Sequence, residues 1–594
     1  MLKTIIKENV YQDSVSLMLL TNKLSAMEGI NRISVMMGTP ANLDIFRNTG
    51  LYTPELERAK PNDICIVIDT EQTEKVTEVL NEIDSFLKNQ ALAGAKNNYD
   101  KVRTWDRAMQ LLPDANLALL SIPGEYVADE AHKALDKGLH VFIFSDNVSE
   151  ADELALKRKA KEKGLLVMGP DCGTGILAGV PIAFANVISE GNIGIVGASG
   201  TGIQEVSTII DRLGGGVSHA IGTGGRDLSE SIGALTMLDG IAALEADPNT
   251  ELIVVISKPP APEVKKKSDG VPTVSVQAVR CHLHGREAVG AGRQRSLCLH
   301  FGGHGDYGRS ARLWEHARIP RLTRDRRGRG DHALQSGQSY IKGLYSGGTL
   351  ATEAAMLVRE AFGIPASLKH EDGYIFKDQG HEIIDLGDDI YTKGRPHPMI
   401  DPSTRKELIS HMAKDPETAV ILFDVVLGYG SHEDMAGELI PSIRNALTHA
   451  SGEGRTVYFV CSVCGTEQDP QNYGEQRRKL EEAGVIVEDS NVQAVKRALH
   501  LVGKSVPPAS SGAPAGTAHG SANAPAGTPH GSSNAPEVPE ATAKLLSGKP
   551  RVINLGLASF ADTIHRYEGK VVQFDWRPVA GGNKKLANIL SKLK

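Results

Sequence analysis

Short apolar runs alternate with amphipathic stretches along most of the chain. This rhythm is typical of buried parallel strands joined by crossover helices, so it predicts an α/β protein with several sheets. The first two runs, at 33–37 and 64–68, indicate a small α/β unit over residues 1–88. A polar stretch at 89–98 is interpreted as the linker that follows this unit.

A second group of apolar runs, separated by helical patterns, predicts a Rossmann-like domain over residues 104–188. These runs lie at 117–122, 141–144 and 165–168. The motif Gly-Pro-Asp-Cys-Gly-Thr at 169–174 follows the last run, where ligand crevices of parallel sheets lie. Cys172 could act as a nucleophile there, but a packing role is favoured, because most single cysteines are buried without chemistry.

Two later stretches, 191–260 and 339–501, echo each other. In each, a Gly- and Ser-rich turn leads into a helical pattern, and an Asp-Pro-x-Thr motif, at 247–250 or 415–418, precedes an apolar strand. Two matches in the same order predict a duplicated α/β domain with parallel sheets.

The stretch from Arg280 to Arg329 departs from this pattern, with twelve Arg, no Lys and almost no apolar periodicity. A nucleic-acid-binding insertion is one interpretation. A local disturbance of the reading frame is favoured, so the loop at 302–305 receives no function. We therefore expect the sheet of the first duplicated domain to be shorter than that of the second.

A Pro-, Ala-, Gly- and Ser-rich tract at 505–539 predicts a flexible tether, since it has too little apolar surface to fold. The tail beyond it, 541–594, has strand-like runs at 552–557 and 571–574. It is too small for a core of its own, so we expect it to dock on another part of the protein.

A net charge of −7 and a pI near 6.3 give no overall attraction for nucleic acid or anionic membranes. Small anionic substrates remain compatible with this charge. The first residues do not form a signal peptide pattern, and no apolar run reaches 18 residues, which favours a cytoplasmic protein without a membrane span. Cys461 and Cys464 form one C-x-x-C pair without a second pair, so ordinary thiols are favoured over metal or redox roles.

The Gly-rich turns are the candidate binding sites, because glycine lets backbone N–H groups approach an anion at a helix N-terminus. Glycine in such turns can also serve close packing alone. Two equivalent turns favour a pair of phosphate-binding sites. The predicted phosphate and substrate ligands are Ser199, Gly200, Thr201 and Gly202 in one turn and Ser346, Gly347, Gly348 and Thr349 in the other, with Gly224, Gly225, Gly428 and Gly430 lining the approach.

Three motifs make the chain similar to the α subunit of succinyl-CoA synthetase: GLLVMGPDCGT (164–174), GNIGIVGASGT (191–201) and IGTGGRDL (221–228). The region 343–501 resembles the CoA-ligase domain of the β subunit. Four further motifs match the FdrA family of this superfamily: QDSVSL (12–17), MMGTPAN (36–42), GLYSGGTL (343–350) and CGTEQDPQ (464–471).

The resemblance implies a Rossmann-like, CoA-binding-like domain at 104–188, followed by two flavodoxin-like CoA-ligase domains at 189–334 and 335–503. It implies acyl-type group transfer with partner subunits, either carbamoyl transfer from oxalurate to phosphate in allantoin breakdown or nucleotide-dependent acyl-CoA synthesis. Phosphate or carbamoyl phosphate is then a substrate, and CoA is an alternative cofactor. The phosphohistidine loop of succinyl-CoA synthetases would fall within 280–329, so no catalytic residue is assigned.

A non-catalytic binding or scaffolding subunit is the hypothesis from another class. The tail motifs RVINLGLASF (551–560) and DWRP (575–578) resemble the start of the partner subunit associated with the FdrA family. This resemblance suggests that a truncated partner subunit is fused to the chain through the tether.

Overall fold

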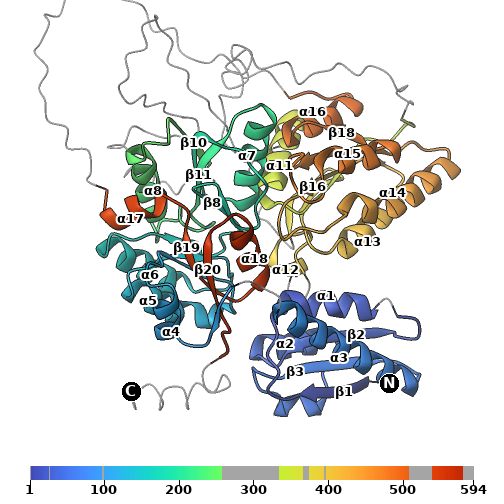
Figure 1. Ribbon diagram of the computed structural model, residues 1–594. Helices are drawn as coiled ribbons and strands as arrows, with labels where there is room; N and C mark the ends of the chain where they lie inside the picture. Colours follow the sequence, from blue (N-terminus) through green and yellow to red (C-terminus); the bar gives the residue numbers. More distant parts are fainter. Residues whose placement is uncertain are drawn as a thin grey trace, which may run out of the picture.

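The computed structural model describes residues 2–25, 27–95, 99–256, 334–364, 373–392, 396–506 and 538–578. Four sheets organise these residues into α/β units, as the apolar rhythm predicted (Figure 1). The stretch from Arg280 to Arg329, with the loop at 302–305, lies outside the described residues, and so does most of the tether.

The N-terminal unit is a three-stranded antiparallel sheet in the order β1-β3-β2, with helices on both faces. Residues alternate along β3: Ile64, Ile66 and Ile68 pack under α1 and α3, while Cys65 and Val67 face the side of α2. Its elements are β1 (Leu2–Lys7), α1 (Ser14–Ser25), β2 (Arg32–Met37), α2 (Pro40–Asn48), the 3-10 helix η1 (Pro54–Arg58), β3 (Ile64–Asp69) and α3 (Thr73–Ala95).

Helix α3 continues through most of the stretch expected to be a linker. The segment 91–95 reads Ala-Leu-Ala-Gly-Ala, and the helix propensity of its Ala and Leu residues outweighs the polar residues on either side. The linker prediction for 89–98 is therefore wrong for residues 89–95.

The Rossmann-like domain is a parallel sheet in the order β4-β20-β19-β5-β6-β7, built from two distant parts of the chain. The C-terminal tail supplies β19 and β20, and β19 pairs with both β20 and β5 in the middle of the sheet (Figure 1). Its elements are β4 (Lys101–Val102), α4 (Trp105–Leu111), β5 (Leu117–Leu120), α5 (Gly124–Asp136), β6 (His140–Ile143), α6 (Glu150–Glu162), β7 (Val167–Met168), α17 (Glu540–Leu546), β19 (Arg551–Leu555), α18 (Ala558–Arg566) and β20 (Lys570–Phe574).

Counted from β19 as the first strand, the order of this sheet is 3-2-1-4-5-6, the arrangement of dinucleotide-binding Rossmann folds. The first β-α-β unit of that fold lies here at the C-terminal end of the described chain. The tail is thus an integral part of the sheet, which confirms that it docks on another part of the protein, and its resemblance to the start of a partner subunit stays a prediction.

The two flavodoxin-like domains share the strand order 2-1-3 around a central first strand. In the first sheet, β11, β10 and β12 have this order, and a hairpin of β8 and β9 extends the edge beside β11. This sheet consists of β8 (Thr174–Leu177), β9 (Val180–Ala183), β10 (Glu190–Gly197), β11 (Val217–Gly222) and β12 (Leu252–Ile256), with helices α7 (Gly200–Arg212) and α8 (Leu235–Ala246).

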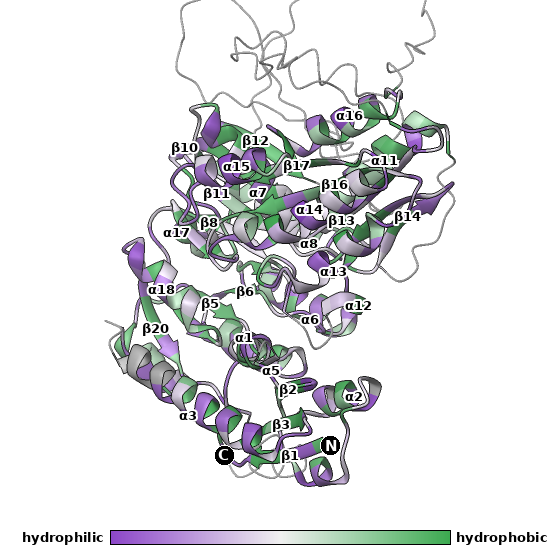
Figure 2. Ribbon diagram, turned by 90° about the vertical axis from the view of Figure 1, so that its right-hand side faces the viewer, coloured by the Kyte–Doolittle hydropathy of each residue, from purple (hydrophilic) through white to green (hydrophobic). Residues whose placement is uncertain are grey.

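The second sheet has six strands in the order β14-β15-β13-β16-β17-β18, parallel except for β14. Figure 2 shows the hydrophobic strand β17 beside the more hydrophilic helix α15. The elements are β13 (Tyr340–Tyr345), α11 (Gly348–Phe362), β14 (Tyr374–Asp378), β15 (His381–Asp385), α12 (Asp389–Thr392), α13 (Ser403–Met412), β16 (Thr418–Val426), α14 (Met435–Gly452), β17 (Tyr458–Cys464), α15 (Tyr473–Glu482), β18 (Ile486–Glu488) and α16 (Asn491–Leu501).

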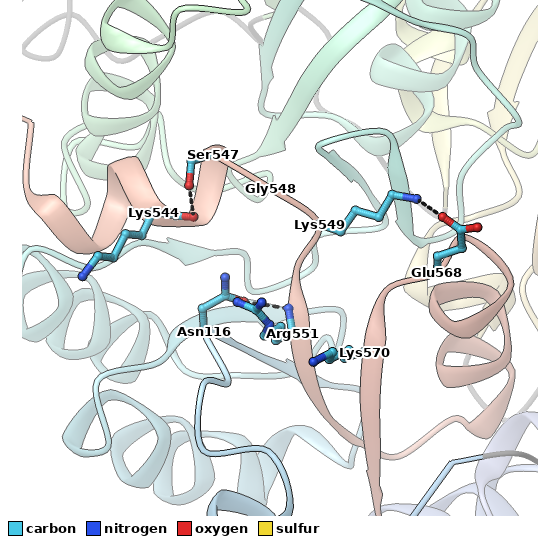
Figure 3. Close-up of a pocket in the computed structure, with 8 residues that line it drawn as sticks. All are labelled: Asn116, Lys544, Ser547, Gly548, Lys549, Arg551, Glu568 and Lys570. Carbon is cyan, nitrogen blue, oxygen red and sulfur yellow. Dashed lines mark hydrogen bonds and ion pairs between the residues drawn. The ribbon is translucent and has the colours of Figure 1, made fainter.

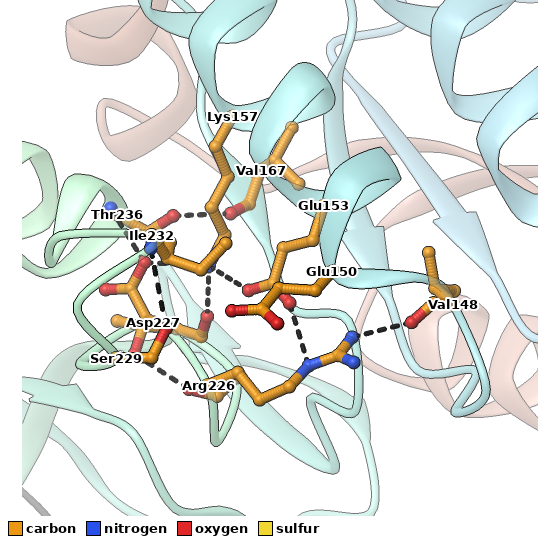
Figure 4. Close-up of polar contacts among 12 residues, drawn as sticks. Val148, Glu150, Glu153, Lys157, Val167, Arg226, Asp227, Ser229, Ile232 and Thr236 are labelled. Carbon is orange, nitrogen blue, oxygen red and sulfur yellow. Dashed lines mark hydrogen bonds and ion pairs between the residues drawn. The ribbon is translucent and has the colours of Figure 1, made fainter.

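A buried ion network joins the Rossmann-like domain to the first flavodoxin-like domain (Figure 4). The Lys157 ammonium on α6 donates to Glu153 Oε1 at 2.8 Å, to Asp227 Oδ1 at 2.7 Å and to the Thr223 carbonyl at 3.0 Å. Arg226 lies 3.0 Å from the second oxygen of Glu153. Lys157, Glu153 and Asp227 are almost fully buried, so each charge depends on the others.

Replacing Lys157 with Met should lower the free energy of unfolding by about 3 kcal/mol, because two buried carboxylates lose their shared cation. Lys161→Met is the matched control, since Lys161 also bridges α6 to α8, through Asp239, but on the surface. The control should change stability by less than about 1 kcal/mol. Urea unfolding of both variants measures the difference, and equal losses would contradict the role given to the buried network.

Candidate functional site

Two helix N-termini meet where the flavodoxin-like domains contact each other. Helix α7 begins at Gly200 and α11 begins at Gly348, each directly after a strand and a short turn. The Ser199 hydroxyl contacts the Thr349 hydroxyl, and a Cβ built on Gly347 would lie 3.0 Å from the Thr201 side chain. The two turns predicted as anion sites therefore form one composite region.

The N-terminus of α7 has two free amide donors. The Ser199 Oγ caps the helix by accepting the N–H of Gly202 at 3.0 Å, so this pair serves the cap. None of the described residues accepts a hydrogen bond from the amides of Gly200 and Thr201. These two amides, together with the positive end of the helix dipole, can bind an anion.

The N-terminus of α11 is held differently, by the carboxylate of Asp424 on β16. This carboxylate accepts hydrogen bonds from the N–H of Ser346 and of Gly347, both at 2.8 Å, and from the Ser346 hydroxyl at 2.9 Å. These hydrogen bonds argue against Ser346 and Gly347 as phosphate ligands, because their donors already bind Asp424. Gly348 and Thr349 keep amides that no described residue accepts.

Arg405 neutralises Asp424 inside the protein. Its guanidinium lies 3.1 Å from the carboxylate and also donates to the Asp424 carbonyl at 2.6 Å, and both side chains are buried. Sequence reasoning missed Asp424. The signal was an acidic residue inside the otherwise apolar strand segment Ile421–Val426, where a carboxylate needs a specific partner.

A second carboxylate stands in front of α11. A Cβ on Gly348 would lie 2.4 Å from Asp385 Oδ2, so only glycine fits this position. A carboxylate here complements the helix dipole and repels a further anion. The start of α7 is thus the better place for a bound phosphate.

Packing accounts for three of the four glycines that were predicted to line the approach. A Cβ on Gly224 would lie 2.3 Å from the Pro170 carbonyl oxygen, and one on Gly428 would lie 2.6 Å from that of Ala185. On Gly430 it would lie 2.0 Å from the Phe184 ring. All three also have positive φ, so glycine is required there without any ligand. Gly225 is half-buried beside Gly224.

Two buried glutamates face each other behind the helix N-termini. Glu205 and Glu353 each lie six residues after the N-cap of α7 and α11, and both bind Asn491. The Asn491 N–H donates to Glu205 at 3.0 Å, and its side-chain amide donates to Glu353 at 2.8 Å. Burial raises the pKa of Glu353 to about 8 and also raises that of Glu205. Their matching positions in the two echoed helices were a signal that sequence reasoning did not use.

The cysteines have the environment of packed thiols. Cys172 is buried, its Sγ lies 3.6 Å from the Thr174 carbonyl oxygen, and burial raises its pKa to about 12, which argues against a nucleophile. Burial likewise raises the pKa of Cys461 and Cys464 in β17. Within the described residues, no cluster of three His, Cys, Asp or Glu side chains could hold a metal.

A cavity of about 370 Å³ lies at the end of the Rossmann-like sheet where strands β19 and β20 begin and the tail enters the domain (Figure 3). It has a cationic lining, but Lys549 pairs with Glu568, Arg551 with Asp114 and Lys544 with Glu540. These pairings account for three of the four cationic side chains in the lining, and Lys570 is the fourth. The lining residues are Asn116, Lys544, Ser547, Gly548, Lys549, Arg551, Glu568 and Lys570.

Three family models match separate parts of the chain. The CoA-ligase model matches residues 344–501, the CoA-binding domain model matches 188–281, and a model described as AllF, heavy metal-associated domain, matches 1–102. With the two flavodoxin-like sheets, these matches place the chain in the CoA-ligase superfamily, which includes succinyl-CoA synthetase.

Among its relatives is YahF of Escherichia coli (strain K12), which is 42% identical over 505 residues, or 82% of this chain and 96% of YahF. The chain belongs to the same family as YahF. The α subunit 2 of the ADP-forming succinate–CoA ligase of Archaeoglobus fulgidus is 28% identical over 149 residues, which cover 24% of this chain and half of that subunit.

The apo form of a dinucleotide-forming acetyl-coenzyme A synthetase 1 from Ca. Korarchaeum cryptofilum is 15% identical. The match covers 65% of this chain and 84% of that one, with a TM-score of 0.22, which adds nothing to the fold assignment. None of the helices in the described ranges is long and apolar enough to cross a membrane.

CoA is the cofactor that this superfamily implies, and the Rossmann-like domain is where its pyrophosphate would bind, at the turn between β19 and α18. There the Leu557 N–H is bound to the Ser121 hydroxyl at 2.8 Å. Phe560 packs against Phe144 and Phe184, with ring centroids 5.0 and 6.0 Å away. Leu557 and Phe560 therefore serve packing at this turn, whereas Ala558 and Ser559 at the start of α18 are exposed.

A metal is implied by the description of the family model that matches residues 1–102. This segment contains no histidine and only one cysteine, Cys65. Cys65 is buried in β3, and burial raises its pKa to about 12. The N-terminal unit therefore matches that family model without a histidine or an accessible thiol to bind a metal.

Proposed function

We propose that this chain is an FdrA-like subunit that transfers a carbamoyl or related acyl group to phosphate. The specific reaction is the conversion of oxalurate and phosphate to oxamate and carbamoyl phosphate, in the cytoplasm and together with a partner subunit. The motifs at 12–17, 36–42, 343–350 and 464–471 support the FdrA assignment.

The observation that carries this proposal is the start of α7, where no described residue accepts a hydrogen bond from the amides of Gly200 and Thr201, beside the start of α11. A phosphate oxygen attacks the carbamoyl carbon, the bond from that carbon to the oxamate nitrogen breaks, and the phosphate proton passes to the leaving nitrogen. Amides fixed at helix N-termini stabilise the oxyanion that develops on the carbamoyl group. We assign no general base.

Nucleotide-dependent acyl-CoA ligation is the competing activity, and its support is the family resemblance alone. The phosphate-dependent reaction is preferred because the amides at the start of α7 suit a phosphate oxygen. A non-catalytic scaffolding role is the third candidate, and product formation distinguishes it from the other two.

Replacing Gly200 with Leu should weaken phosphate binding at least ~tenfold, because the side chain blocks the free amides of α7. Calorimetric titration with inorganic phosphate measures the change. Gly452→Leu is the matched control, since a Cβ on Gly452 meets no atom within 4 Å and the residue lies at the end of α14. Gly348 is a poorer target, because a Cβ there collides with Asp385.

The reaction itself is tested with the partner-reconstituted protein, oxalurate and phosphate. Carbamoyl phosphate should form without CoA or nucleotide, and the Gly200→Leu variant should lose this activity while Gly452→Leu keeps it. Turnover of a carboxylate that requires CoA and nucleotide would establish the ligase instead. Equal phosphate binding by the wild type and Gly200→Leu would contradict the proposed site.

A further inference from the structure

Thr174 is a buried residue whose hydroxyl has no hydrogen-bond partner among the described residues. Its side chain is 2% exposed at the start of β8, the strand that the Rossmann-like domain contributes to the neighbouring sheet. Buried hydroxyl groups normally form hydrogen bonds, because desolvation without a partner costs stability. An isosteric valine would avoid that cost, so the unpaired hydroxyl calls for an explanation.

The explanation lies in its position against the first turn of α7. A Cβ built on Gly200 would lie 3.2 Å from Thr174 Oγ1 and 3.4 Å from the Cα of Gly173. The hydroxyl therefore lies against Gly200 in the first turn of α7, where none of the described residues accepts a hydrogen bond from the amides of Gly200 and Thr201. The hydroxyl of β8 and these two amides are thus three donors, from two neighbouring elements, that no described residue uses.

We propose that Thr174 is a further ligand of the anion site, donating its hydroxyl hydrogen to an oxygen of a phosphate or acyl phosphate bound at the α7 N-terminus. This inference rests on the proposed function, because it adds a residue to the same site. A hydroxyl donor and two amides match the oxygens of a tetrahedral anion, as in other helix N-terminal phosphate sites. Thr174 is the last residue of the Gly-Pro-Asp-Cys-Gly-Thr segment. Through it, the Rossmann-like domain contributes directly to phosphate binding.

The packing of this segment holds the hydroxyl in place. A Cβ on Gly222 would lie 2.3 Å from Cys172 Sγ and 2.6 Å from the Thr174 carbonyl oxygen, so β11 and the segment are in close contact. Strand β8 also pairs with β11, through Ile176 and Ala220. These contacts fix the backbone that carries the hydroxyl, and such pre-organisation of a ligand residue favours affinity.

The test compares Thr174→Val, Thr174→Ser and Thr418→Val in the full chain by calorimetric titration with inorganic phosphate and by thermal unfolding. Thr418 is the matched control, because its hydroxyl is also buried without a partner, at the start of β16. Thr174→Val should bind phosphate ~tenfold more weakly without any fall in melting temperature, since one charge-assisted hydrogen bond is lost while no internal bond is broken. Thr174→Ser and Thr418→Val should bind within ~threefold of the wild type.

Three outcomes would overturn the inference. If Thr174→Val binds like the wild type while Gly200→Leu is weakened, the anion site stands and Thr174 is not part of it. If Thr418→Val weakens binding as much as Thr174→Val, the effect is not specific to this hydroxyl. If the wild type itself does not bind phosphate, both this inference and the proposed function are wrong.

Discussion

A chain that ends at Val506 should lose the fold of its Rossmann-like domain while keeping that of the second flavodoxin-like domain. The deletion removes β19 and β20, which lie between β4 and β5, together with the fully buried side chains of Val552, Ile553 and Leu555. With Phe560 and Ile564 of α18, also buried, their contribution is on the order of 10 kcal/mol, as large as the stability of a typical domain.

Hydrogen exchange measures this outcome, because the amides of β5 and β6 should lose protection while those of β16 and β17 keep it. The control is a full-length chain with a protease site inserted in the tether at 507–537. After cleavage the tail should remain bound, because its interface with β5 is unchanged. Unaltered protection of β5 and β6 in the truncated chain would contradict the role of β19.

The contribution of Glu353 to stability should fall as pH rises from about 4.5 to 8. Burial raises its pKa in the folded protein from 4.5 to about 8, and the nearby Glu205 adds to the shift while Lys496 opposes it. The folded state keeps a proton that the unfolded chain releases above pH 4.5. The stabilisation is therefore complete below that pH and is lost as pH rises through 8, by up to ~tenfold in the folding equilibrium per pH unit.

Replacing Glu353 with Gln should flatten this pH dependence, since an amide stays neutral and can still accept from Asn491. The matched control is Glu360→Gln, which changes an exposed residue near the end of the same helix. Urea midpoints at pH 5, 6, 7 and 8 measure both slopes. A pH slope that is the same in Glu353→Gln and Glu360→Gln would show that the buried carboxyl does not control stability.

The regular elements were predictable because their apolar periods are strong and local. The runs at 117–122, 141–144 and 252–256 correspond to β5, β6 and β12, and the echoed turns do precede helices α7 and α11. The 2-1-3 strand order of both flavodoxin-like domains agrees with the fold class expected from the resemblance.

The long-range contacts could not be predicted in this way. No periodicity tells that Ser199 touches Thr349, that Asp424 accepts the amides of Ser346 and Gly347, or that Thr174 lies beside Gly200. Each contact depends on how two separately predictable elements pack. The Gly-rich turns therefore identified the region, while the individual ligands required the three-dimensional arrangement.

Because β19 lies inside the sheet, the Rossmann-like domain cannot complete its fold in the cell until the tail has been synthesised. Leu555 accepts a hydrogen bond from Ser121, and 434 residues separate the two. At ~5–20 residues per second, the ribosome needs roughly 20 to 90 s to synthesise this interval. During that time β5 has been made but its central neighbour has not, so its hydrophobic edge stays open to other chains. Until the tail has been synthesised, either chaperones must cover this edge or encounters between unfinished chains must be slow.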